Sequence, residues 1–215
     1  MTARLVVKEL SKKYNSFLAL APASFDLNAG EIVILSGPNG SGKTTLLSCL
    51  SALIRPSSGT VQVSGFDLYR DEVEVRRRLV FVPDVPRFYV ELTAWEHLRF
   101  IALANEVQQG FEARAEELLR SFDLWQAKDL FPHRFSRGMR LKLGLALALI
   151  RPFEVLLLDE PTSALDVEGV ELLKGELRRL RDQGATILLS THDPNLIQQL
   201  GDRRLTIRQG VLEAD

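Results

Sequence analysis

The apolar residues follow strand-like patterns over the first third of the chain. They either alternate with polar residues or form short β-branched runs, and both patterns are typical of strands. Strands are therefore expected at Leu5–Leu10, Phe25–Leu27, Glu31–Ser36 and Gly59–Gly65. The spacing changes to a helical one over Gly42–Leu53, which ends before Arg55-Pro56. This region predicts β-structure that surrounds one helix.

Between Asp71 and Ile150 the apolar spacing is helical. Thr93 and Glu96 have the spacing of a capping box and stand at the start of the amphipathic run Trp95–Leu103. A second helix is expected over Glu112–Phe122, and a third begins near Ser136. This part of the chain therefore predicts a helical insertion.

Two apolar strands, Val155–Leu158 and Thr186–Ser190, follow the insertion and are separated by a charged helix of about Val167–Arg181. A strand, a crossover helix and a second strand are typical of a parallel sheet. The sequence shows no internal repeat or long linker. The expected fold class is α/β, with one domain interrupted by helices.

Composition narrows the classes of partner. The chain has 27 basic and 28 acidic side chains, so its formal charge of −1 provides no general attraction to nucleic acid, and no nucleic-acid partner is expected. The single cysteine, Cys49, cannot form a disulfide within the chain and is expected to be buried. No apolar stretch reaches the ~20 residues that a membrane-spanning helix needs, so a partner must supply any membrane span.

A glycine-rich phosphate-binding motif follows the expected strand that ends at Ser36. It matches G-x-x-x-x-G-K-[ST] and lies between a strand and a helix, which is the context that this motif requires. The residues expected to bind phosphate are Gly37, Pro38, Asn39, Gly40, Ser41, Gly42, Lys43, Thr44 and Thr45. Lys43 would reach the β- and γ-phosphates, and the Thr44 hydroxyl would bind Mg²⁺. The motif predicts a nucleoside triphosphate and by itself fits a kinase or a GTPase equally.

Two carboxylates follow the apolar strand Val155–Leu158. Asp159 is expected to bind Mg²⁺, and Glu160 to orient or deprotonate the attacking water. An acidic turn before Pro161 is the alternative. Together with the phosphate-binding motif, the pair indicates hydrolysis.

These motifs, in this order, resemble the ATP-binding subunits of ABC transporters over nearly the whole chain. The resemblance implies a P-loop NTPase of the ABC ATPase fold, with a RecA-like core, an antiparallel β portion and a helical lobe. It implies a single domain over residues 1–215, in which 1–84 and 151–215 form the core lobe and about 85–150 the helical lobe.

Phe135–Met139 is similar to the family's signature L-S-G-G-Q. The residues that would contact ATP held by an opposite subunit are Ser136, Arg137, Gly138 and Met139.

Three further residues match the family pattern. Asp166 is similar to the D-loop aspartate at the dimer seam, and His192 to the histidine that senses the γ-phosphate. Tyr14 is similar to the aromatic residue that stacks on adenine, which favours ATP. A polar histidine at a strand end and a single exposed tyrosine are the alternatives for the last two.

The chain departs from the family pattern at two motifs. Asp84 stands where the family has glutamine, and the resemblance implies a contact with Mg²⁺ there; an ordinary turn aspartate is the alternative. In the signature, Arg137 and Met139 replace glycine and glutamine. This variant looks like the ABC-2 branch of exporters, and Leu92–Leu98 is similar to small haem-exporter-type ATPases.

The resemblance implies an ATP-hydrolysing subunit with ATP and Mg²⁺ as cofactors. Two copies, or this chain and a paralogue, would close around ATP and drive a transmembrane permease from the cytoplasmic face of the membrane, with export as the expected direction. A chromosome-maintenance ATPase would need coiled-coil or zinc insertions, and a small-molecule kinase would need an acceptor lid. A non-hydrolysing regulatory cassette is the third alternative, and Glu160 and His192 argue against it.

Overall fold

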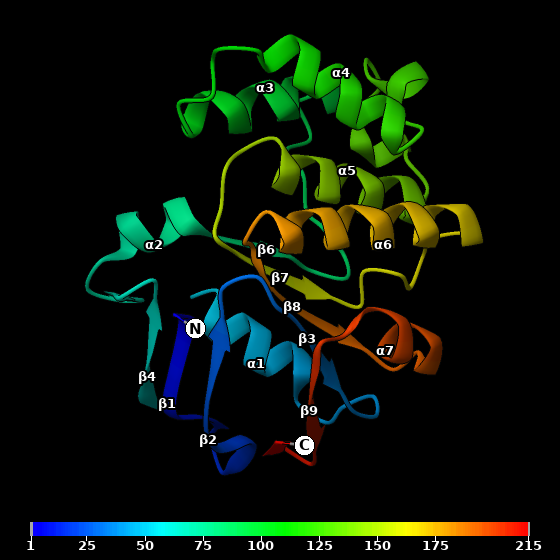
Figure 1. Ribbon diagram of the computed structural model, residues 1–215. Helices are drawn as coiled ribbons and strands as arrows, with labels where there is room; N and C mark the ends of the chain where they lie inside the picture. Colours follow the sequence, from blue (N-terminus) through cyan, green and yellow to red (C-terminus); the bar gives the residue numbers. More distant parts are fainter. Residues whose placement is uncertain (1, 215) are drawn as a thin grey trace. The chain divides into compact units, whose positions relative to one another are not determined.

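The computed structural model describes residues 2–214 and divides the chain into two compact units. The first unit comprises Met1–Phe81, Phe153–Glu160 and Gly175–Asp215. The second unit comprises Val82–Pro152 and Pro161–Lys174. The chain therefore passes between the units after Phe81, Pro152, Glu160 and Lys174. Figure 1 shows the elements of each unit.

The first unit contains a four-stranded antiparallel sheet in the order β2-β1-β4-β5. Its strands are β1 (Ala3–Tyr14), β2 (Phe17–Asn28), β4 (Ser58–Val63) and β5 (Phe66–Asp67). The β1 strand is longer than expected, because a bulge at Glu9, whose φ is 50°, shifts the register and lets the pairing continue. The strand predicted up to Gly65 ends at Val63, since Ser64 and Gly65 have positive φ and turn the chain into β5.

A six-stranded sheet in the order β10-β9-β3-β8-β7-β6 forms the other layer of strands. Its strands are β3 (Ile32–Ser36), β6 (Leu79–Val82), β7 (Val155–Asp159), β8 (Thr186–Thr191), β9 (Arg203–Arg208) and β10 (Val211–Ala214). β3, β7, β8 and β9 run parallel, and β10 pairs antiparallel with β9. Every residue of β3, β7 and β8 is buried, which explains their continuous apolar runs.

The first unit contains α1 (Lys43–Leu50), α2 (Glu72–Arg78) and α7 (Pro194–Leu200), and also the last residues of the helix α6 (Val167–Asp182), from Gly175 on. The apolar side chains of α1 share one core cluster with residues of both sheets, such as Leu5 of β1 and Val33 of β3. The helix ends at Leu50, earlier than the predicted Leu53, because Ala52 has a φ of 59° and reverses the chain. The first unit is thus built around α1, with its start held at the end of β3.

Cys49 lies in this core, as the sequence predicts. Burial raises the pKa of its thiol to about 11, and the nearby Lys12 only partly opposes this shift. The thiol is therefore protonated below that pH and acts as a small apolar side chain.

The second unit is helical. It contains α3 (Ala94–Ala104), α4 (Phe111–Ser121), the short 3₁₀ turns η1 (Trp125–Ala127) and η2 (Pro132–Arg134), and α5 (Arg137–Leu149), together with the first half of α6 (Val167–Asp182). The predicted capping box is confirmed: the Glu96 N–H donates to Thr93 Oγ1 at 3.2 Å, and the Thr93 N–H donates to Glu96 Oε2 at 2.8 Å. The predicted helix start at Ser136 is also confirmed, since this residue is the N-cap of α5.

The segment before α3 is anchored by a buried histidine. His97 Nε2 accepts the Tyr89 N–H at 2.9 Å, and Nδ1 lies 2.7 Å from the Thr93 carbonyl oxygen. An acceptor at Nε2 places the ring proton on Nδ1, so both nitrogens of the neutral ring are satisfied. His97 therefore has a structural role in this unit.

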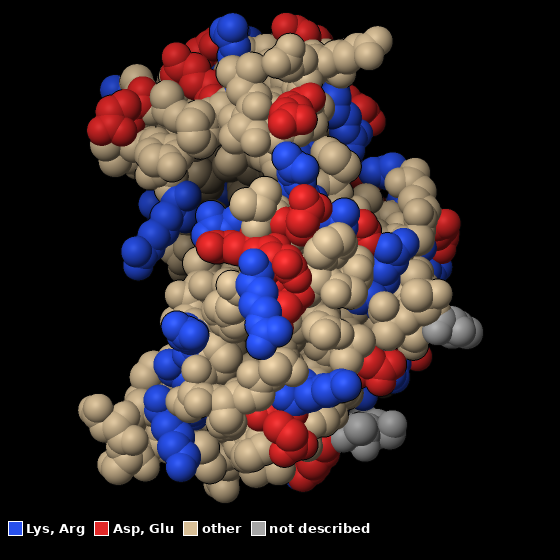
Figure 2. All heavy atoms as spheres, turned by 90° about the vertical axis from the view of Figure 1, so that its left-hand side faces the viewer, with Lys and Arg blue, Asp and Glu red and all other residues tan. Residues whose placement is uncertain are grey.

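Charged side chains are mixed over the face shown in Figure 2, where basic and acidic groups alternate with uncharged surface. This distribution agrees with the formal charge of −1. Within residues 2–214, no helix combines the length and the apolar character needed to cross a membrane.

Candidate functional site

The loop between β3 and α1 can be built only with glycine at its turning points. Gly40 and Gly42 have φ of 76° and 112°, a region that side chains disfavour. A Cβ at Gly37 would lie 2.3 Å from the Ile207 carbonyl oxygen, so this position has no room for a side chain. The loop also leads into the N-terminus of α1, where backbone N–H groups favour an anion.

The buried groups of this loop fit a phosphate. Ser41 Oγ is buried and has no hydrogen-bond partner among the described residues. The Lys43 side chain is 6% exposed, and its ammonium donates to the Gly37 and Pro38 carbonyl oxygens at 2.9 and 3.3 Å. An unsatisfied hydroxyl and a buried cation, both inside one glycine loop, are groups that a phosphate would satisfy. Asn39, Gly40 and Thr44 are exposed on the same segment.

The two acidic residues of the β7 end are held by β8. Asp159 is 3% exposed, and its Oδ1 accepts from Ser190 Oγ at 2.6 Å. The same hydroxyl oxygen accepts the Glu160 N–H at 2.9 Å. Asp159 and Ser190 are register partners of the parallel pair β7–β8, so the sheet itself sets this contact. The sequence analysis did not predict Ser190 as a site residue. Its position at the end of the predicted strand Thr186–Ser190 could have indicated it, because the ends of neighbouring parallel strands meet at one edge of the sheet.

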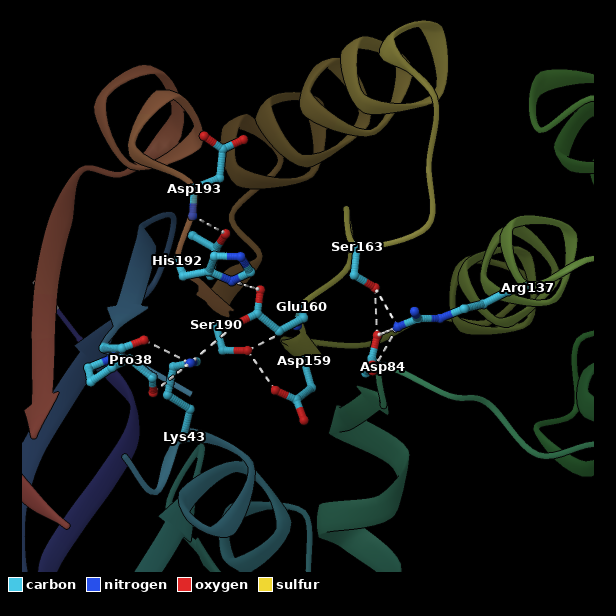
Figure 3. Close-up of polar contacts among 12 residues, drawn as sticks. Pro38, Lys43, Asp84, Arg137, Asp159, Glu160, Ser163, Ser190, His192 and Asp193 are labelled. Atoms are coloured by element: carbon cyan, nitrogen blue, oxygen red, sulfur yellow. Dashed lines mark hydrogen bonds and ion pairs between the residues drawn. The ribbon is translucent and has the colours of Figure 1, made fainter. Parts of the chain in front are cut away.

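Glu160 joins these groups to Lys43 and His192 (Figure 3). Its Oε2 lies 3.1 Å from His192 Nδ1, and its Oε1 lies 3.3 Å from Lys43 Nζ, an ion pair without hydrogen-bond geometry. Glu160 has a φ of 47°, an uncommon value outside glycine that its N–H bond to Ser190 helps to hold. The first unit therefore brings Lys43, Asp159, Glu160 and His192 together at the carboxyl ends of parallel strands.

The oxygen groups at this edge fit Mg²⁺. Within residues 2–214 no cluster of three or more His, Cys, Asp or Glu side chains is arranged to hold a metal ion. Mg²⁺ needs no such cluster, because it commonly takes one or two protein oxygens and completes its shell with water and phosphate. The Asp159 carboxylate and the Thr44 hydroxyl, both in the first unit, are donors of that kind.

Tyr14, the residue predicted to stack on adenine, lies at the end of β1 in the same unit. Its ring is half exposed, and Lys12 Nζ lies 4.9 Å from the ring centroid. The position opposite on β2 is Phe17, which is also exposed. The tip of this hairpin thus presents two aromatic rings to solvent.

The remaining predicted residues belong to the second unit. Ser136 Oγ accepts the Met139 N–H at 3.1 Å, and a Cβ at Gly138 would lie 2.6 Å from the Ala164 carbonyl oxygen.

Asp166 Oδ1 accepts the Gly169 N–H at 2.9 Å, so it caps α6. The Asp84 carboxylate receives the Arg137 guanidinium, a contact that the sequence did not predict.

The sequence model of the ABC transporter family matches residues 20–163 of this chain. The chain belongs to the ABC transporter family. The peptide export ATP-binding protein SkfE of Bacillus subtilis is 33% identical over 210 residues, which cover 97% of this chain and 87% of SkfE. The sulfate/thiosulfate import protein CysA of Mycobacterium tuberculosis is 34% identical over 215 residues, which cover 99% of this chain and 61% of CysA. ABC relatives of this chain thus include both export and import proteins.

A solved structure supports the same assignment. The ATP-binding cassette MJ0796, in a dimeric post-hydrolysis state with ADP and Pi, matches with a TM-score of 0.89 and 27% identity over 98% of either chain. The predicted fold class and family are therefore confirmed. This chain is an ATP-binding subunit of an ABC transporter and carries the ABC ATPase domain.

Ser190 provides a test of how this ABC ATPase holds its carboxylates. Replacing Ser190 by alanine removes one bond to Asp159 and leaves the Glu160 N–H without its partner. Losing a bond to a buried group costs about 1–3 kcal/mol, so we expect Ser190→Ala to lower kcat for ATP by roughly 5- to 150-fold. Steady-state ATPase kinetics measure this effect. Ser190→Thr keeps the hydroxyl and is the matched control; an alanine variant with the wild-type kcat would remove Ser190 from this role.

Proposed function

We propose that this ABC subunit hydrolyses Mg²⁺-bound ATP at the carboxyl edge of β3, β7 and β8. The grouping of Lys43, Asp159, Glu160 and His192 in the first unit carries the proposal. In it, the loop Gly37–Thr45 binds the phosphates, and Lys43 neutralises charge on the β- and γ-phosphates.

Each acidic group has a separate task in this proposal. Asp159 and the Thr44 hydroxyl hold Mg²⁺, which would neutralise charge on the phosphates. Glu160 takes a proton from the attacking water, and His192, at 3.1 Å from its carboxylate, orients Glu160 toward the γ-phosphate. Tyr14 stacks on the adenine ring. The hydrogen bond from Ser190 holds the buried Asp159 carboxylate in place during the reaction.

Closure with a second copy or a paralogue completes the site in this proposal. The residues that would then contact the ATP of the opposite subunit are Ser136, Arg137, Gly138 and Met139, with Asp166 at the seam. The dimeric state of MJ0796 with ADP and Pi supports this assembly. We propose one ABC ATPase domain, with residues 1–84 and 151–215 as core lobe and about 85–150 as helical lobe. ATP binding favours the closed dimer and hydrolysis opens it.

The proposed partner is a transmembrane permease, with this subunit on the cytoplasmic face of the membrane. Export is the proposed direction, because the signature variant with Arg137 and Met139 resembles the ABC-2 exporters and because SkfE is a peptide export protein. Because relatives of this chain include import proteins as well, the signature variant is the reason for preferring export.

The direct test is ATP hydrolysis by the purified chain. Phosphate release should require Mg²⁺ and stop when a chelator is added, and it should accelerate when the subunit is reconstituted in vesicles with its permease. Absence of hydrolysis in the reconstituted complex with Mg²⁺ would contradict the proposal. Inside-out vesicles with labelled candidate cargo both inside and outside would show the direction when ATP is added, since an exporter raises the amount of cargo inside them and an importer lowers it.

A further inference from the structure

Two positions at which this chain departs from the ABC pattern meet in the second unit. Asp84 and Arg137 are 53 positions apart, yet Arg137 Nη2 donates to Asp84 Oδ1 at 2.8 Å and to Oδ2 at 3.0 Å. Both residues belong to the second unit. The contact needs a carboxylate, because both atoms facing Nη2 accept, whereas a glutamine would present one acceptor and one donor group. Asp84 and Arg137 therefore match each other chemically.

Ser163 closes a triangle with this pair (Figure 3). Its Oγ donates to Asp84 Oδ1 at 2.6 Å and accepts from Arg137 Nη2 at 3.1 Å. The contacts of Arg137 within residues 2–214 all use Nη2, so Nε and Nη1 remain as donors. Because a guanidinium is planar, holding one nitrogen at three oxygens restricts the direction of the others.

The triangle joins three segments with separate places in the site. Asp84 follows β6, and Ser163 lies three residues after Glu160, just beyond the point at which the chain enters the second unit. Arg137 is the first residue of α5, directly after the signature serine. The close approach of Gly138 to the Ala164 carbonyl oxygen is a second contact between the same two segments. The start of α5 is therefore tied to the segment that follows Glu160.

We propose that Asp84 and Ser163 are positioning residues for Arg137. They hold its guanidinium at the start of α5 so that Nε and Nη1 bind a phosphate oxygen of the ATP held by a second copy. This inference rests on the proposed function, since it requires closure around ATP. It assigns a purpose to both departures at once: the arginine adds a phosphate contact, and the aspartate fixes its direction.

The exposure of the pair sets the size of the effect. The Arg137 and Asp84 side chains are 52% and 35% exposed, so solvent screens their attraction. Exposed ion pairs contribute little because water screens them, so the expected loss in kcat is at most roughly fivefold. We expect Asp84→Ala to lower kcat by about threefold to fivefold, with the ATP affinity of the monomer changed by less than about twofold.

A double-mutant cycle on ATP turnover tests the proposal. kcat, the KM for ATP and the melting temperature are measured for wild type, Asp84→Ala, Arg137→Ala and the double variant. Asp84 acts only through Arg137, so removing it in the Arg137→Ala background should change kcat no further. Single effects that multiply in the double variant would overturn the proposal, as would Asp84→Ala with the wild-type kcat.

Conservative variants separate positioning from a folding defect. Asp84→Glu retains a carboxylate and Ser163→Thr retains the hydroxyl, so both should recover most of the kcat that Asp84→Ala and Ser163→Ala lose. Failure of both to recover activity, at an unchanged melting temperature, would count against positioning by these groups.

The metal role expected for Asp84 predicts a different result. If Asp84 binds Mg²⁺, Asp84→Ala and Asp84→Gln should change the Mg²⁺ concentration needed for half-maximal ATP binding, and Arg137→Ala should not. That outcome would mean that Asp84 binds Mg²⁺, and it would overturn the proposal that Asp84 positions Arg137. A wild-type chain that does not hydrolyse ATP would instead contradict the proposed function, so the two failures can be told apart.

Discussion

Replacing Glu160 by glutamine should leave ATP bound but stop most of its turnover. Glutamine keeps the size of the side chain and a carbonyl oxygen, while it loses the ability to take a proton from water. General-base catalysis contributes about 10²–10⁴-fold, so we expect kcat to fall by at least about a hundredfold. The dissociation constant for ATP should stay near that of wild type, because Lys43 and the glycine loop remain.

The same variant should accumulate closed dimers. ATP favours closure and hydrolysis resets it, so a protein that binds without hydrolysing stays closed. Sedimentation of Glu160→Gln at tens of micromolar with ATP and Mg²⁺ should show a dimer that wild type forms only transiently. Glu213→Gln, a substitution at an exposed position of β10, is the matched control. Turnover near the wild-type rate would remove Glu160 from its role as base, and a monomer under these conditions would favour a required paralogue or permease.

Replacing Lys43 by alanine should weaken ATP binding itself. The buried Lys43 ammonium donates to the carbonyl oxygens of Gly37 and Pro38, inside the loop that fits a phosphate. A hydrogen bond to a charged group contributes about 1.5–3 kcal/mol, so we expect the dissociation constant to rise by roughly 10- to 150-fold.

Fluorescence titration with ATP and Mg²⁺ measures this loss. Lys8→Ala, at an exposed position of β1, removes the same charge away from the loop and should bind like wild type. Thermal unfolding of both variants separates lost affinity from lost structure. If Lys43→Ala bound ATP as tightly as wild type, Lys43 would not contact phosphate. Glu160→Gln and Lys43→Ala thus separate the chemical step from ground-state binding.

The motif-bearing strands were predictable because their signals are local. β3, β7 and β8 are buried on both faces, so their apolar runs stand out and the residues that follow them mark the site edge. The phosphate loop uses backbone groups of successive residues, and consecutive sequence therefore specifies it. The N-caps of α3 and α5 depend on side chains within three residues.

Two C-terminal strands and one short helix were not predicted, because their signals are not local. β9 and β10 carry charges on their exposed faces and are recognisable only once they pair with β3 and with each other. The Pro194–Leu200 helix is only two turns long, too short for its period to be read with certainty. The conformation of β9 depends on its pairing with β3, which is distant in the sequence.

Adjacent residues specify the chemistry proposed for this ABC subunit: a phosphate loop, an aspartate proposed to bind Mg²⁺ and a candidate base. The contacts that hold these groups arise only in the folded chain. Parallel register places Ser190 beside Asp159, and packing in the second unit places Arg137 on Asp84 and Ser163. Such contacts join residues tens of positions apart and depend on register and helix packing, which no local pattern encodes.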